Sequence, residues 1–329
     1  DGTLPIEAVL ISVTPPDEHG FCSLGVSVGG TLPATQVAKV VIAQVNRNLP
    51  RTYGDSHVHV SKIDYLVEAD TPLPTMESGP VGEVEAAIGR NCASLIEDGS
   101  TLQLGIGSIP DAVLKSLTDK KDLGIHSEMI ADGVIDLYEK GIINGAKKTL
   151  HKGKIVVAFL MGSQRLYDFV HNNPDVEVLP VDHVNDPWVI GQNSKMVSIN
   201  SCLQVDFNGQ VNSESMGTQQ FSGVGGQLDY IRGSFLSPGG KAILAMPSTA
   251  KKGTLSRIVP VFEAGTTVTT PRTDTHYIVT EYGIANLRGK SLRERAKLLI
   301  GIAHPKFHEE LWAAYKERYG EDENFLSHS

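Results

Sequence analysis

The feature that most restricts the fold of this chain is an apolar run, a helical pattern and a second apolar run within residues 101–128. TLQLGIG (101–107) predicts a buried strand that ends in glycines, IPDAVLKSL (109–117) predicts a helix with proline near its start, and LGIHSE (123–128) predicts a second strand. Two strands joined through a helix almost always lie parallel with a right-handed connection. Their carboxyl ends therefore open onto the same edge of a sheet.

Similar patterns continue along the rest of the chain. Residues 4–70 contain short apolar runs separated by turns, which predict strands and loops. Further strands are expected at 154–163, 176–186, 242–248, 256–262 and 276–283, and helices at 81–99, 165–173 and 291–318, the last broken at Pro305. Glycine provides 33 of the 329 residues and aromatic side chains only 6%, which favours tight turns over a β-sandwich. The prediction is an α/β fold.

Chain length and one segment without periodicity indicate two domains. A chain of 329 residues exceeds the usual size of a single hydrophobic core. The run ADTPLPTMESGPVGE is rich in proline, glycine and acidic residues and is the best linker candidate. We therefore expect a first domain over 1–72, a linker over 73–82 and a second domain over 83–329.

Charge and cysteine usage exclude several kinds of partner. The formal net charge is −9 and no basic run occurs, which argues against nucleic acid or an anionic membrane. No stretch has the roughly 20 apolar residues of a membrane span. Cys22, Cys92 and Cys202 lack the spacing of metal or redox sites, and His57 and His59 lack a third ligand. We expect a reducing cytoplasm and no metal site.

Glu128 lies at the end of the second strand of the 101–128 unit, where α/β proteins commonly bind ligands. There it could act as a general base, a metal ligand or a covalent nucleophile. The nearest potential co-ligands, His126 and Asp132, do not form a recognisable metal set. As a nucleophile an ionised carboxylate needs no activating base, and it suits an activated acyl donor such as a thioester. A structural role, as a helix cap or in an ion pair with lysine, is the commoner use of strand-end acids.

Two glycine-rich segments could bring backbone N–H groups close to an anionic ligand or a developing oxyanion. The first comprises Gly105, Ile106, Gly107, Ser108 and Ile109; it resembles a dinucleotide fingerprint only weakly, because Pro110 replaces the third glycine. The second lies in FSGVGGQLDYIRG and contains Ser222, Gly223, Gly225 and Gly226. The second segment can equally be a tight turn that requires positive φ.

Two further polar positions follow expected strands. Lys251, in PSTAKKG, is a candidate phosphate contact, although most loop lysines are simply solvated. His183, in VDHVND, could orient a substrate but is more often a satisfied core histidine. The HExxH, GxSxG and P-loop patterns do not occur, so the corresponding metalloprotease, hydrolase and nucleotidase interpretations lose support.

Seven stretches together resemble the acetyl-CoA hydrolase/transferase family, and within it most closely the 4-hydroxybutyrate and butyryl-CoA:acetate CoA-transferases. The stretches are GDSHVHVSKID, LQLGIGSIPDAV, GIHSEMIADG, VNSESMG, FSGVGGQLDYIRG, PSTAKKGTLSRIVP and TEYGIANLRGKSLRERAKLLIGIAHPKF. The resemblance implies two open-sheet α/β domains of the CoA-transferase type, with the active site between them. It also implies that Glu128 forms a glutamyl-CoA thioester and that the GIGSI segment, the GVGG segment and Lys251 contact coenzyme A.

Several expectations follow from this resemblance. Coenzyme A and its acyl thioesters would be substrates rather than tightly bound cofactors, and a short-chain carboxylate would be the second substrate. An acyl-CoA hydrolase and, less readily, a nucleotide-binding oxidoreductase are the alternatives. Family members carry roughly a hundred residues before the segment that begins here at Asp1, so the first domain is expected to be truncated or completed by a second polypeptide. A homo-oligomer is also expected.

Overall fold

An eight-stranded open sheet forms the centre of the molecule in the computed structural model, which describes residues 3–77 and 79–320. All neighbouring strands in it are parallel except the last pair, which is antiparallel. In spatial order the strands are β11 (Val176–Val178), β9 (Ile155–Val157), β7 (Gly124–His126), β6 (Thr101–Leu104), β12 (Met196–Ser201), β17 (Lys241–Ala245), β21 (Tyr277–Thr280) and β22 (Gly283–Asn286).

The order of these strands reverses once, between β6 and β12. The chain starts at β6, moves outward through β7, β9 and β11, and then returns to β12 on the other side of β6 before continuing to β22. A right-handed connection places its helix on opposite faces of the sheet for these two directions. The reversal thus forms a topological switch point, where the loops after two adjacent strands leave in opposite directions and open a crevice.

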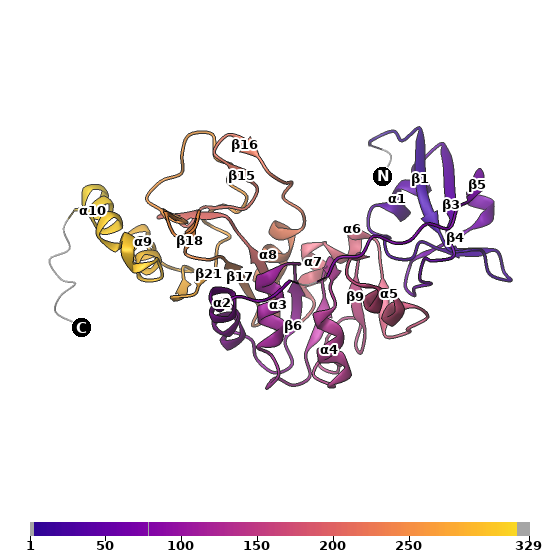
Figure 1. Cartoon of the computed structure of the whole chain (residues 1–329), viewed down its shortest axis with the longest axis horizontal. Helices are drawn as coiled ribbons and strands as arrows, with labels where there is room; N and C mark the ends of the chain where they lie inside the picture. The colour runs from indigo at the N-terminus through magenta and orange to yellow at the C-terminus, as the bar shows by residue number, and fades with distance from the viewer. Residues whose placement is uncertain (1–2, 78, 321–329) are drawn as a thin grey trace.

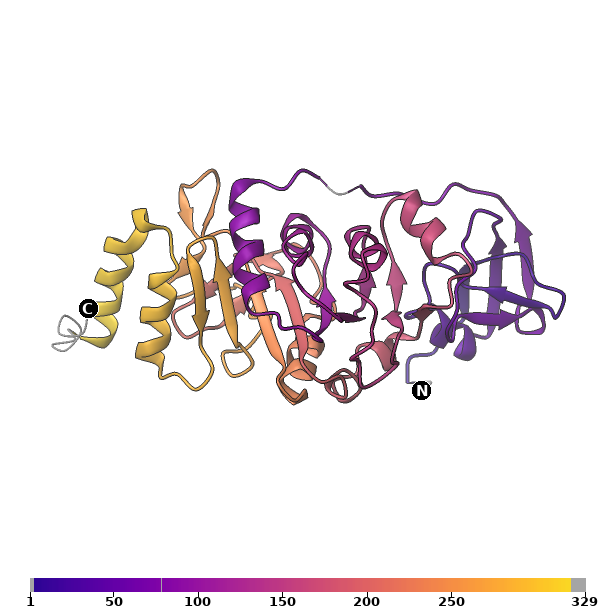
Figure 2. The same ribbon diagram turned by 90° about the horizontal axis from the view of Figure 1, so that it is seen from below.

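Helices cover both faces of the sheet, as Figure 2 shows. On one face lie α2 (Glu83–Ser94), α3 (Ser108–Lys115) and α4 (Gly133–Glu139), and on the other lie α7 (Pro187–Gly191) and α8 (Gln227–Leu236). The remaining helices are α5 (Gln164–Val170), α6 (Val181–Val184), α9 (Leu292–Gly301), the 3₁₀ turn η2 (Pro305–Phe307) and α10 (His308–Tyr319). Ser291 and Glu294 form a capping box that fixes the start of α9.

A smaller unit lies at one end of the elongated molecule, opposite α9 and α10 (Figure 1). It contains a parallel three-stranded sheet in the order β1-β3-β5 and an antiparallel pair of β2 and β4. Its elements are β1 (Ala8–Val13), β2 (Phe21–Ser23), α1 (Thr31–Val37), β3 (Val40–Val45), β4 (His57–His59), the 3₁₀ turn η1 (Val60–Lys62) and β5 (Tyr65–Glu68). The segment after β5 runs back along the molecule to α2 (Figure 2).

The loops of the large sheet contain short strands that pair in sets of two or three. They are β8 (Met129–Ile130) with β10 (Phe159–Leu160), β13 (Gln204–Asp206) with β14 (Val211–Asn212) and β20 (Ile258–Val259), β15 (Ser215–Met216) with β16 (Gln219–Gln220), and β18 (Thr249–Ala250) with β19 (Leu255–Ser256). Within the part of the chain that is described, no helix combines the length and apolar character needed to cross a membrane.

The predicted α/β architecture with open sheets is confirmed, and β6 and β7 are parallel as expected. The structure shows in addition that they are direct neighbours. The tail also folds as predicted, into two helices separated at Pro305. Other expectations were wrong in detail. The strand expected over 176–186 stops at Val178, because Pro180 cannot donate to a ladder and α6 begins directly after it. The strand expected over 256–262 is similarly reduced to short pieces before Pro260.

Some elements were not anticipated at all. Helix α1 lies in a region expected to hold only strands and loops, and β2 occupies an expected turn. The strand β12, one of the two at the switch point, was not predicted, because the MVSINS sequence mixes buried apolar and buried polar side chains. Ser198 of this strand is fully buried. Because both faces of such a central strand are covered, its side chains do not alternate between apolar and polar, and the usual strand pattern is missing.

Helix α3, which begins directly after β6, packs closely against α2 through Gly89. A Cβ atom at position 89 would lie 2.6 Å from the backbone carbon and oxygen of Ala112. We predict that Gly89→Ala lowers the free energy of unfolding by about 2 kcal/mol, because the two backbones must separate. Gly301→Ala is the matched control, since that helical glycine has open space around it. Equal unfolding midpoints in urea for the two variants would contradict this account of the packing.

Candidate active site

A cavity of about 270 Å³ opens at the carboxyl ends of β6 and β12, at the switch point of the large sheet. The loop after β7 and the turn that precedes α8 complete its wall. The lining residues are Gln103, Leu104, Gly105, Ile106, Glu128, Met129, Phe159, Asn200, Ser201, Ser213, Ser222, Gly223, Val224, Gly225, Gly226, Gln227 and Tyr230. Open α/β sheets bind ligands at this position, so the cavity is the candidate active site.

Glu128 is held in this cavity by its backbone and by one side-chain oxygen. Its carbonyl oxygen accepts the N–H groups of Ala158 and Phe159, at 2.9 and 3.0 Å, which joins the loop after β7 to the loop after β9. Its Oε2 accepts a hydrogen bond from Nδ2 of Asn185 at 2.9 Å. The single O–H of Tyr230 is shared between Oδ1 of Asn185, at 3.3 Å, and the Val184 carbonyl oxygen, at 3.1 Å, which orients the Asn185 amide with its N–H₂ toward Glu128. One carboxylate oxygen is therefore anchored.

Gly226 must be a glycine for Glu128 to occupy this position. A Cβ atom at residue 226 would overlap Oε2 of Glu128 and would also lie 2.6 Å from Nδ2 of Asn185. The missing side chain thus lets the carboxylate lie directly against the turn that opens α8. Gly226 gives α8 no side-chain cap, so N–H groups of its first turn remain available to a ligand or to water.

The GIGSI segment forms a second glycine turn on the other side of the cavity. Gly107 has φ +112° and ψ −178°, a conformation that L side chains rarely adopt, and it offers no side chain to cap α3. N–H groups at the start of α3 thus point out of the helix without a capping partner from Gly107. Residues of both glycine turns, Gly105 and Ile106 in one and Gly223, Gly225 and Gly226 in the other, line the same cavity as Glu128.

The cavity brings together most, but not all, of the residues predicted from the sequence. Glu128 lies in its lining together with Gly105, Ile106, Ser222, Gly223, Gly225 and Gly226. Gly107, Ser108 and Ile109 begin α3 beside it but are not lining residues. Lys251 is exposed at the tip of the β18–β19 hairpin, at φ +47°, and does not line the cavity.

Several site residues were missed by the sequence reasoning. Asn185 follows α6 in a segment expected to be a strand, and nothing in the sequence marked it. Gln103 and Asn200 pair through two reciprocal amide hydrogen bonds of 3.0 Å, although 97 positions separate them. A polar Gln103 in the middle of the apolar run TLQLG was the one available signal for this pair.

Buried polar groups hold the backbone behind Glu128. Nε2 of His126 lies 2.9 Å from the Val184 carbonyl oxygen, which also accepts the Tyr230 hydroxyl at 3.1 Å. Burial lowers the pKa of His126 to about 3, so the ring is neutral and donates through Nε2. Burial and, to a smaller degree, the nearby Glu128 charge raise the pKa of Tyr230 well above its usual value, so it remains a donor. These bonds fix the end of α6 and hence Asn185.

Lys148 holds the backbone of β7, the strand that precedes Glu128, to the residue just before β9. Its buried Nζ donates to the carbonyl oxygens of Ile125 and Lys154, both at 2.8 Å. Burial lowers the pKa of Lys148 to about 7, because the interior disfavours the charged ammonium.

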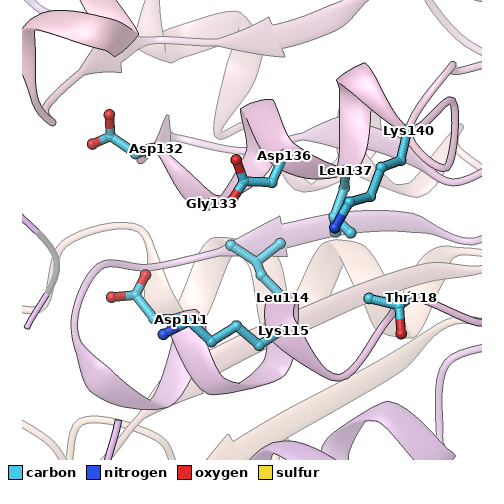
Figure 3. A pocket seen from close by; sticks show the side chains of 9 residues that line it. All are labelled: Asp111, Leu114, Lys115, Thr118, Asp132, Gly133, Asp136, Leu137 and Lys140. Atoms are coloured by element: carbon cyan, nitrogen blue, oxygen red, sulfur yellow. The ribbon is translucent and has the colours of Figure 1, made fainter. Parts of the chain in front are cut away.

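A separate hollow of about 240 Å³ lies between α3 and α4 and does not include Glu128 (Figure 3). Asp132, the potential co-ligand of Glu128 named from the sequence, lies at this hollow. Its carboxylate accepts hydrogen bonds from the N–H and hydroxyl groups of Ser163. Among the described residues, no group of three or more His, Cys, Asp or Glu side chains is arranged to hold a metal ion.

Comparison with known proteins gives consistent matches over almost the whole chain. Family models described as the acetyl-CoA hydrolase/transferase N-terminal and C-terminal domains match residues 2–77 and 162–315. The chain is 62% identical to the 4-hydroxybutyrate coenzyme A transferase of Clostridium kluyveri, a match that covers 96% of this chain and 74% of that relative. It is 40% identical to the butyryl-CoA:acetate CoA-transferase of Anaerostipes caccae, over 93% of this chain and 71% of the relative.

A solved structure shows the same fold. The crystal structure of 4-hydroxybutyrate CoA-transferase from Porphyromonas gingivalis superimposes with a TM-score of 0.88 at 49% identity. The superposition covers 97% of this chain and 76% of that chain.

The contact between Gly226 and Glu128 generates a prediction. Gly226→Ala should slow any covalent reaction at Glu128 by about 100-fold, because the new methyl group displaces the carboxylate and Asn185 from their positions. Gly223→Ala, in the same turn, should cost far less, since a Cβ there has open space. The rate is followed by mass spectrometry of the peptide that contains residue 128. Similar rates for the two variants would show that the close approach is unimportant.

The buried ammonium generates a second prediction, in pH dependence. The pKa of Lys148 is about 7 in the folded chain and 10.5 in the reference state, so between these values the unfolded chain binds the additional proton and stability rises with pH. Relative to Lys148→Met, the wild type should therefore gain about 2 kcal/mol between pH 7 and pH 9. Urea unfolding at both pH values measures this difference. Lys147→Met, at an exposed neighbour, should show no such change.

Proposed function

The chain belongs to the acetyl-CoA hydrolase/transferase family and is a CoA-transferase, and we propose that Glu128 is the carboxylate that carries coenzyme A between its two substrates. The substrates are a short-chain acyl-CoA, such as 4-hydroxybutyryl-, butyryl- or acetyl-CoA, and a free carboxylate such as acetate. One observation supports this role above the others: Glu128 lines the switch-point cavity directly against a glycine turn. A helix cap or surface ion pair would not place a carboxylate there.

The proposed reaction proceeds in two halves. The free oxygen of Glu128 attacks the acyl-CoA carbonyl carbon, and the CoA thiolate leaves to give a mixed anhydride. The thiolate then attacks the Glu128 carbonyl carbon, which releases the original acid and forms a glutamyl-CoA thioester. The acceptor carboxylate attacks this thioester, and the thiolate leaves and attacks the acceptor's carbonyl carbon, which regenerates Glu128. No step requires a proton donor, which suits a cavity lined mainly by amides, hydroxyls and glycines.

Residues around Glu128 have distinct proposed tasks in these steps. Asn185 anchors Oε2, so the other oxygen is free to attack. Each addition creates a tetrahedral oxyanion, and N–H groups of the two glycine turns are the available donors; loss of one such donor typically raises a barrier by about 3 kcal/mol. His126 and Tyr230 act indirectly, by fixing the backbone that presents Asn185. Binding of the long CoA chain away from the reacting carbon can further stabilise the transition state.

The remaining CoA contacts, the location and the assembly stay proposals from sequence. Gly105 to Ile109 and Ser222 to Gly226 would contact the pantetheine end near the thioester. Lys251, exposed beside Lys252, would meet a phosphate at the far end of the molecule. Three buried free cysteines support a reducing cytoplasm. A homo-oligomer and a second polypeptide beside the first unit are likewise expectations.

Hydrolysis is the second candidate, because water that reached the anhydride would release the acid and free CoA. The transferase names of the similar proteins favour transfer. The two activities separate in one assay that compares CoA release from butyryl-CoA with and without acetate. Because the chain belongs to this family, the interpretation of the GIGSI segment as part of a nucleotide-binding oxidoreductase is not retained.

A trapping experiment tests the role of Glu128. Incubation with butyryl-CoA followed by borohydride should reduce the thioester at residue 128 to an alcohol, which peptide mass spectrometry detects as a loss of about 14 mass units, the change from carboxyl to hydroxymethyl. Glu128→Gln should abolish transfer while CoA still protects the protein against thermal unfolding. Glu83→Gln, at an exposed position in α2, should behave as wild type. Label on another residue, or turnover retained in Glu128→Gln, would overturn the assignment.

A further inference from the structure

A chain of three polar side chains leads from β11, at the edge of the large sheet, to α6, the helix that ends next to Asn185. Nδ1 of His151 lies 2.9 Å from Oε2 of Glu177 in β11, and Nε2 of His151 lies 3.0 Å from Nε2 of His183 in α6. The two imidazole rings meet edge to face, with an angle of 88° between their planes. His183 does not line the switch-point cavity, so any effect it has on the reaction is indirect.

The hydrogen atoms of this chain are placed by the chemistry of its three members. A carboxylate only accepts hydrogen bonds, so Nδ1 of His151 carries the hydrogen that points to Glu177. When His151 is neutral, its Nε2 has a lone pair and accepts the N–H of His183. One additional proton is tolerated, because His151 then donates and His183 accepts. A second additional proton is not, because both Nε2 atoms would carry hydrogen and both rings would be positively charged.

Helix α6 connects the position of His183 to that of Asn185. The helix has only four residues, and Asn185 follows it directly. The His183 N–H donates to the Pro180 carbonyl oxygen at 3.1 Å and the Asn185 N–H donates to that of Val181 at 2.8 Å, so both residues belong to the same short turn. Nδ2 of Asn185 in turn holds Oε2 of Glu128 at 2.9 Å. A displacement of His183 therefore moves the group that anchors the candidate nucleophile.

Charged and titratable groups from every neighbouring element face the histidine pair. They are Asp55 of the smaller unit, Asp182 and Asp186 in and after α6, Glu177 of β11, Lys148 of the loop before β9 and His126 of β7. Burial lowers the pKa of His151, the Glu177 carboxylate opposes this effect, and positive charge on Lys148 or His183 lowers the pKa further. Both rings line a hollow of about 520 Å³ between α6 and the smaller unit, and the His151 side chain is 24% exposed. Protons from solvent therefore reach the pair.

We propose that His183, held by His151 and Glu177, is a positioning residue for CoA transfer, because it fixes α6 so that Asn185 can anchor Glu128. The inference rests on the proposed transfer through Glu128. While the chain is intact, α6 stays in place. Once the pair takes up its second additional proton, the two rings repel each other and Asn185 is displaced. Transfer then slows at acid pH, although none of its own steps requires a proton donor, and the effect falls on kcat because Asn185 holds Glu128 and not the substrate.

The test is the pH dependence of kcat for transfer from butyryl-CoA to acetate, between about pH 5 and pH 8. The wild type should lose about tenfold in kcat toward the acid end. His183→Gln has an amide that donates to His151 but takes up no proton, so it should keep kcat within about threefold of the wild type at pH 8 and lose less than about threefold at pH 5. His19→Gln, at an exposed position of the smaller unit, is the matched control and should retain the acid loss of the wild type.

Two results would overturn the inference: a wild-type kcat that does not fall at acid pH, or an acid loss that persists in His183→Gln. The second result would assign the loss to another group, such as Lys148. Absence of transfer by the wild type at every pH would instead refute the proposed function on which the inference rests.

Two further variants separate positioning from a merely structural role. Glu177→Gln still accepts the N–H of His151 but removes the negative charge that favours proton uptake, so the acid loss should move about 0.5 pH unit lower. His183→Ala leaves His151 without its partner and should lower kcat about tenfold at pH 8, while CoA still protects the protein against thermal unfolding. An acid loss that moves higher or stays in place in Glu177→Gln would contradict the inference. The two glutamine variants decide the question even if His183→Ala does not fold.

Discussion

The parallel pairing of β6 with β7 on one side and β12 on the other is the interaction on which the site depends. Leu102 is opposite Ile125 in one ladder and Val197 in the other, so three strands end at nearly the same level. The loops after β6 and β7 carry the GIGSI turn and Glu128, and Asn200 lies near the end of β12. No other part of the described sheet combines three such ends with a reversal of strand order. The strand order alone therefore determines at which edge of the sheet the candidate active site lies.

Within that edge, the close approach of Glu128 to Gly226 determines which chemistry is available. The Glu128 carboxylate lies against the turn that opens α8, and no larger residue could replace Gly226 without moving it. The bond from Asn185 then distinguishes the two carboxylate oxygens. A held carboxylate with one free oxygen is suited to forming and releasing a bond to carbon.

The local elements of this site could be predicted from the sequence, but the contacts that bring them together could not. Glu128 and the two glycine segments could be predicted because strand ends and glycine turns have short-range signatures. Asn185 could not, since Pro180 converts an apparent strand into a helix whose end carries it, and the consequence is visible only in three dimensions. The pairing of Gln103 with Asn200 depends on β12, whose buried polar side chains hide its strand character. The α/β class followed from alternating patterns, whereas the position of the switch point did not.

The described lining of the cavity contains no lysine, arginine or histidine, and this absence bears on the mechanism. A lysine or arginine beside Glu128 would stabilise its ionised form and make it a weaker nucleophile, and it would also bind the released acid tightly. Neutral donors avoid both effects, because they strengthen only as charge develops on the oxyanion in each tetrahedral intermediate. A lining without a cation is therefore suited to a carboxylate that must first attack a carbonyl carbon and later be released.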